Sequence, residues 1–161
     1  LCCAEFGGAD IVWPMGFAPA HNPFAWIGTH AFAYPLLEAL HIVGIAMLLG
    51  SLLLIELRVW GFGAALPVEP LARLALPLTL AGFALAATTG SLMFASQPGD
   101  LIANRVFVVK MGLVMLAGLN AASFHARGGL QRVDPMARAQ TLISVGIWLA
   151  VIFCGRWIAY R

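Results

Sequence analysis

The sequence predicts an all-α integral membrane protein: a four-helix bundle preceded by an interfacial N-terminal segment. The chain has 161 residues, of which 61% are hydrophobic and only 10% are charged. About 25% of the residues in an average soluble domain are charged, so this composition is typical of a membrane protein. The four longest charge-poor stretches each approach the roughly 17–25 residues that a helix needs to cross a bilayer. They use most of the chain, so no second folded domain is expected.

The first 35 residues are predicted to lie outside the membrane or along its surface. This lead-in, residues 1–35, ends in a group of aromatic side chains, namely Phe24, Trp26, Phe32 and Tyr34. Aromatic residues with a polar edge favour the headgroup region of a bilayer. The lead-in is therefore expected to rest at the interface before the first span.

The bundle itself is assigned to residues 36–161. Its spans are expected at about residues 36–57, 72–96, 102–125 and 138–158. Pro35 suits the first turn of the first span, because proline loses no helical hydrogen bond there. Glu56 and Arg58 are expected to return the chain to water after that span. Residues 96–100 (SQPGD) have the composition of a turn between the second and third spans.

The arginines predict an orientation in the membrane. The side with the loops after the first and third spans carries Arg58, Arg73, Arg127, Arg132 and Arg138. The other side carries Arg105, Arg156 and Arg161. Because basic residues concentrate on the cytoplasmic side, both chain ends are expected on the periplasmic side of a bacterial inner membrane.

Several classes of function find no support in the sequence. The net charge is only +2 and the basic residues are scattered, so no run follows a nucleic-acid backbone. The three cysteines lack the spacing of a metal site. Motifs of hydrolases and of phosphoryl-transfer enzymes are missing too, and we assign no catalytic residue. The expected partners are the lipid bilayer and either other membrane subunits or further copies of the chain.

Three ionisable residues within the spans are the leading candidates for function. Glu38 and His41 lie in the first span and Lys110 lies in the third. The rise per residue places His41 roughly 9 Å, and Lys110 roughly 12 Å, into parallel spans. All three are thus expected in the outer leaflet, beside Asn104 and Arg105. Charged groups in a span are costly, which makes them candidates for a site.

Two interpretations of this cluster remain open. On a helical wheel Glu38, His41 and Glu56 share one face of the first span, which is expected to look into the bundle. In the first interpretation Glu38, His41 and Lys110 form an outward-facing pocket that binds an anionic or redox ligand. In the second, Glu38 pairs with Lys110 and His41 is hydrogen-bonded in the core. The sequence does not distinguish between these two interpretations.

Haem b and copper are the cofactors to be considered. Ligands in a helical bundle come from facing helices, so His41 is the candidate metal ligand. Its partner for haem would be His30 or Met93, because His125 lies roughly 20 Å away at the other end of the bundle. Copper would suit His41 with Met93 or Met47, since it accepts imidazole and thioether ligands. No spacing distinguishes these options.

Residues 34–126 resemble a family of small uncharacterised bacterial four-helix membrane proteins. The resemblance rests on four short motifs: His41 and Gly44, Glu56 to Arg58, Thr89 and Gly90, and Asn104 with Phe107 and Lys110. A more distant similarity is to the membrane domain of copper-resistance D-type proteins, which also pair a first-span histidine with a third-span lysine. This chain has half the spans of full-length members of that family and no methionine-rich loop.

These observations lead to one functional hypothesis with two alternatives. The chain is expected to be a non-enzymatic membrane subunit of a redox or energy-converting complex. Its outer-leaflet pocket would bind a cofactor, a quinone or a lipid through His41, Lys110 and Glu38, with Arg105, Asn104, Met93 and His30 as further candidates. The alternatives are a copper-handling membrane protein and a structural subunit without a ligand.

Overall fold

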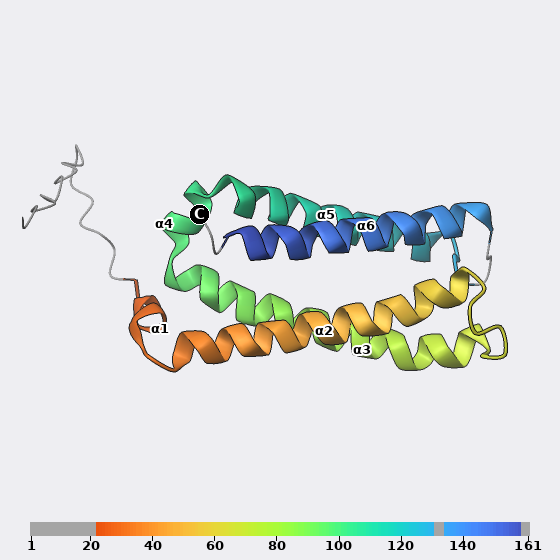
Figure 1. Cartoon of the computed structure of the whole chain (residues 1–161), viewed down its shortest axis with the longest axis horizontal. Coiled ribbons are helices and arrows are strands. Elements are labelled where there is room, and N and C mark those ends of the chain that lie inside the picture. Colours follow the sequence, from red (N-terminus) through yellow and green to blue (C-terminus); the bar gives the residue numbers. More distant parts are fainter. Residues whose placement is uncertain (1–21, 131–133, 159–161) are drawn as a thin grey trace, which may run out of the picture.

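The computed structural model describes residues 22–130 and 134–158, and all the regular structure in these residues is helical. The helices are α1 (Ala25–Thr29), α2 (Ala33–Val59), α3 (Val68–Ser96), α4 (Pro98–Ala103), α5 (Arg105–Ala126) and α6 (Pro135–Ile158) (Figure 1). Four of them, α2, α3, α5 and α6, are long and apolar enough to cross a membrane. The predicted all-α architecture with four spans is confirmed.

The two ends of the bundle differ in what they contain (Figure 1). One end, which we call the terminal end, holds α1, α4 and the end of α6. The opposite end, which we call the loop end, holds the connections that follow α2 and α5. Since α2 and α5 both run from the terminal end to the loop end, they are parallel, as the depth argument for His41 and Lys110 requires.

The helix ends differ from the sequence-based predictions in two places. Helix α2 begins at Ala33, two residues before Pro35. The last three residues of the turn expected at 96–100 instead begin α4, which has Pro98 in its first turn. The Asn104 side chain then accepts a hydrogen bond from the Val106 N–H at 2.9 Å and caps α5. Asparagine favours this position because its oxygen satisfies an amide that the helix leaves free.

Helices α2 and α3 form a hairpin whose backbones touch. A Cβ atom on Gly44 would lie 2.7 Å from the amide nitrogen of Ala86, and one on Gly82 would lie 2.6 Å from that of Leu48. Small residues are what allow membrane helices to approach this closely. The hydroxyls of Ser51 and Thr79 add a 2.7 Å hydrogen bond between the helices. Gly82 and Ala86 therefore make this part of α3 a packing surface for α2.

Helices α5 and α6 form the second hairpin, which is packed by side chains. Ala117, Ile147 and Val151 make a small apolar cluster between the two helices. The Asn120 side-chain amide donates to the main-chain carbonyl of Gln140 at 3.0 Å and so joins α5 to α6. Gln140 in turn donates to the hydroxyl of Ser123 at 2.9 Å.

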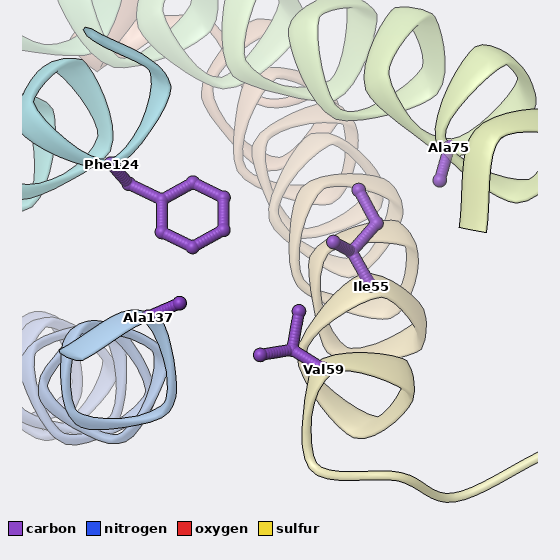
Figure 2. Packing of buried hydrophobic residues seen from close by; sticks show 5 residues of the cluster. All are labelled: Ile55, Val59, Ala75, Phe124 and Ala137. Carbon is purple, nitrogen blue, oxygen red and sulfur yellow. The ribbon is translucent and has the colours of Figure 1, made fainter. Parts of the chain in front are cut away.

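At the loop end all four long helices share one apolar core (Figure 2). The cluster consists of Ile55 and Val59 from α2, Ala75 from α3, Phe124 from α5 and Ala137 from α6. The Trp60 indole also donates to the Thr141 hydroxyl at 2.8 Å, which joins the end of α2 to α6. The two hairpins are therefore held together at this end.

Toward the terminal end the two hairpins stand apart (Figure 1). Buried residues in this half, such as Gly44 and Thr89, belong to contacts within one hairpin. One aromatic pair joins α3 to α5: the rings of Phe94 and Phe107 stack with centroids 5.5 Å apart and planes 4° from parallel. The terminal end is thus bridged by rings, with no apolar core comparable to that of the loop end among the described residues.

Large apolar side chains cover the outer surfaces of the long helices. Leu74, Met115, Leu119 and Phe153 each expose more than three fifths of their surface. In water such an extensive apolar surface would cause association, whereas in a bilayer it faces lipid tails. The chain is therefore a multi-pass membrane protein.

Candidate functional site

His41 is fixed against α3 by one hydrogen bond and one glycine. Its Nδ1 atom lies 3.0 Å from the Thr89 hydroxyl oxygen. A Cβ atom on Gly90 would lie 3.0 Å from the imidazole Cε1 atom, so the ring occupies space that only glycine leaves open. The imidazole is half-buried between α2 and α3. Helix α3 thereby sets both the position and the orientation of the ring.

The hydrogen bonds around Thr89 assign the imidazole tautomer. The Thr89 hydroxyl has one proton, which it donates to the Leu85 carbonyl at 2.7 Å. When the Thr89 hydroxyl donates to this carbonyl, its oxygen accepts the bond from His41, and this arrangement favours the tautomer with the proton on Nδ1. Nε2 then carries a lone pair, and the Ala86 backbone is a second hydrogen-bond partner of the ring. The Nε2 side of the ring can accept a proton or bind a metal ion.

Lys110 is placed on the other hairpin in a similar way. It lies on α5 and faces α6, where its ammonium nitrogen would be 3.5 Å from a Cβ atom on Gly155. Cys154, the residue before that glycine, is also close enough to act on it electrostatically. Ala117, two turns beyond Lys110 on α5, is buried in the apolar cluster between α5 and α6. The lysine is half-buried.

His41 and Lys110 approach each other from the two hairpins at the terminal end. They are close enough to interact electrostatically. The stacked rings of Phe94 and Phe107 lie near both, since Phe107 is one turn before Lys110 and Phe94 is about one turn after Gly90. An imidazole, an ammonium and two aromatic faces thus gather where the hairpins stand apart. We call His41, Lys110, Phe94 and Phe107 the inter-hairpin site.

The other polar candidates lie around this site in different roles. Glu38 is exposed, and it forms no salt bridge with Lys110. Of the two interpretations left open by the sequence, the one in which Glu38 pairs with Lys110 is therefore wrong. Asn104 caps α5, and Arg105, the first residue of that helix, is exposed.

The candidate metal partners of His41 lie at the end of α1 and on α3. His30 is at the end of α1, where its Nδ1 accepts the Phe32 amide and its ring lies 6.2 Å from Trp26. Met93 is on α3, one turn beyond Thr89. Within the described residues no three His, Cys, Asp or Glu side chains converge to hold a metal.

Glu56 corrects another expectation. The sequence suggested that it returns the chain to water, but only 2% of its surface is exposed. Its Oε1 atom is fully buried and has no hydrogen-bond partner among the described residues. The reason is the approach of α6, which covers this part of α2 near the loop end.

Comparison of the chain with protein-family models, with curated proteins and with solved structures gives no match. The chemistry of the site is therefore argued from its geometry. Thr89, Phe107 and the pair Gly90 and Gly155 were not predicted to contribute to a site. The spacing of Phe107 could have indicated its role. It lies three residues before Lys110, which places both side chains on the same face of α5.

Proposed function

We propose that the protein is a membrane subunit whose inter-hairpin site binds the polar ring of a quinone-like molecule, within a larger redox or energy-converting complex. The observation that carries this proposal is the pairing of His41 and Lys110, one from each hairpin, beside two stacked phenyl rings. Each group supplies an interaction that a quinone ring can use, and the apolar helix surfaces suit its isoprenoid tail.

The two polar groups have complementary roles. The Lys110 ammonium donates hydrogen bonds, which suits a quinone carbonyl or the oxygen of a reduced ring. The Nε2 lone pair of His41 accepts one, which suits the hydroxyl of a quinol. Phe94 and Phe107 present flat faces on which a planar ring can stack, worth about 0.5–1.5 kcal/mol for an aromatic pair. The same donor and acceptor would also hold an anionic lipid headgroup, but the aromatic faces favour a ring.

The apolar surroundings suit a ligand that arrives through the membrane. Quinones reach their sites from the hydrocarbon region, and large apolar side chains cover the outer surfaces of the helices that carry His41 and Lys110. The arginine distribution supports an orientation in which the terminal end faces the periplasm of an inner membrane, as the positive-inside rule predicts.

Copper handling is the second candidate, and the His41 tautomer favours it. Metal-binding histidines usually donate their other ring N–H to a fixed acceptor, as His41 Nδ1 does to Thr89. Copper would need further soft ligands, for which Met93 is the nearest candidate along α3. Quinone binding requires Lys110, whereas a cation would be repelled by it, so we favour the quinone.

Purification from native membranes tests the proposal. Extraction of the detergent-purified protein, followed by mass spectrometry, should recover about one quinone per chain. The variants His41→Ala and Lys110→Leu should each lose most of it. Metal analysis and oxidised and reduced absorbance spectra on the same sample separate the alternatives. Copper lost only in His41→Ala, or a haem spectrum, would contradict the quinone assignment.

A further inference from the structure

Two polar contacts join α2 to α6 near the loop end, and the proposed function uses neither of them. The Trp60 indole donates to the Thr141 hydroxyl. One turn earlier on α2, the Glu56 carboxyl is hydrogen-bonded to the Ser144 side chain, which lies about one turn after Thr141 on α6. Because α2 and α6 run in opposite directions (Figure 1), the two contacts follow each other along one interface between the hairpins.

The Glu56 carboxyl is enclosed in this interface without a counter-ion. The side chain is almost completely buried, and its Oε1 atom has no hydrogen-bond partner among the described residues. Burial and the Ser144 hydrogen bond are the influences that act on the carboxyl. The charged side chains of this end are bonded to other groups or exposed, namely Arg58, Glu69, Arg73, His125, Arg127, Asp134 and Arg138.

This environment fits the protonated acid better than the carboxylate. A carboxylate has about four lone-pair sites for hydrogen bonds, and here one hydroxyl serves it in apolar surroundings. In the acid, the O–H group can donate to the Ser144 hydroxyl oxygen. What then lacks a partner is a carbonyl-type oxygen, a less costly group to bury than a charge. The contact between the hairpins therefore depends on a bound proton.

We propose that Glu56 is a proton-controlled switch in the contact between the two hairpins. The acid keeps α6 against α2 through Ser144. When the proton leaves to water, the remaining carboxylate needs hydration, which requires α6 to move away from α2 at this point. Water is near, because Glu56 is three residues before the end of α2, or roughly 4.5 Å of helix. In the orientation that the arginines favour, the switch responds to cytoplasmic pH.

Distances between spin labels on α2 and α6 test this proposal on the full chain in detergent. Labels are attached to Leu53→Cys and Leu149→Cys, with the native cysteines replaced by serine. Both leucines line the small groove between the two helices and are exposed, so labels there disturb little packing. As pH rises, a population with a longer distance should grow. Its ratio to the short-distance population should increase by up to about tenfold per pH unit, the limit for release of one proton.

Matched variants assign the response to one carboxyl. Glu56→Gln is neutral at every pH, so its labels should stay close throughout. Glu38→Gln alters the exposed carboxyl on the same face of α2 and should keep the wild-type response. Ser144→Ala weakens the closed state and should separate the helices at lower pH. His41→Ala should behave as the wild type, so the switch is tested independently of ligand binding.

Labelling with dicyclohexylcarbodiimide adds a measurement that needs no substitution at Glu56. This apolar reagent reacts with protonated carboxyl groups within membranes, and mass spectrometry of peptides locates the adduct. The adduct should form at Glu56 at low pH and be lost over the pH range in which the labels separate. Three results would each overturn the proposal: a distance that does not change with pH, the same change in Glu56→Gln, or no adduct at Glu56.

Discussion

Glu38 and Glu56 occupy the same face of α2 and yet have opposite environments. They are eighteen positions apart, which is five helical turns, so both side chains leave the helix in nearly the same direction. Glu38, at the terminal end, is exposed, whereas Glu56, near the loop end, is 2% exposed. The difference comes from α6, which packs on α2 near the loop end and diverges from it toward the other.

This contrast indicates that the two ends of the bundle have different roles. The loop end holds a core shared by four helices, and we infer that it keeps the hairpins together. At the terminal end one pair of stacked rings connects α3 to α5, and the polar groups of the inter-hairpin site lie beside that pair. Substitutions should therefore affect folding at the loop end and binding at the terminal end.

The largest loss of stability is expected at Gly44, where the backbones of α2 and α3 touch. Gly44→Leu places a side chain where even a Cβ atom lies 2.7 Å from the Ala86 nitrogen, so α2 and α3 cannot pack. The cost should exceed about 3 kcal/mol, and little folded protein should remain. Size-exclusion chromatography in detergent measures this. Gly50→Leu is the control, because nothing lies within 4 Å of a Cβ atom there; equal losses would contradict the packing account.

A smaller effect is expected from the core of the loop end. Phe124→Ala removes the largest side chain of the four-helix cluster and should lower the free energy of unfolding by about 3 kcal/mol. Ligand binding at the other end should persist in the molecules that remain folded. Titration with denaturing detergent gives the change in stability. Phe83→Ala is the matched control, since that ring is 45% exposed on α3 and should cost far less.

The smallest change in stability is expected at the terminal end. Phe94→Leu removes the stack on Phe107 and should cost about 1 kcal/mol, the value of one aromatic pair. It should nevertheless weaken quinone binding, because one face of the ring site is lost. Phe153→Leu, at a ring that is 69% exposed, should change neither quantity. A stability loss as large as that of Phe124→Ala would show that the two ends contribute equally to the free energy of unfolding.

Much of this architecture can be predicted from the sequence, because hydrophobic length determines spans directly. The placement of His41 and Lys110 at one end also follows from the rise per residue in parallel helices. The burial of Glu56 could not be predicted in this way, since it depends on where α6 crosses α2. The same limit explains the missing Glu38–Lys110 pair: equal depth in a membrane does not fix the distance between two helices.

The central claim is that one ligand is held jointly by His41 and Lys110 from the two hairpins. A double-mutant cycle measures this directly, with a short-chain ubiquinone titrated into wild type, His41→Ala, Lys110→Leu and the double variant. The account predicts that each single variant weakens binding about tenfold, or 1.4 kcal/mol. The double variant should lose at least about 0.5 kcal/mol less than the sum. Strictly additive losses, or unchanged affinity in either single variant, would contradict a shared site.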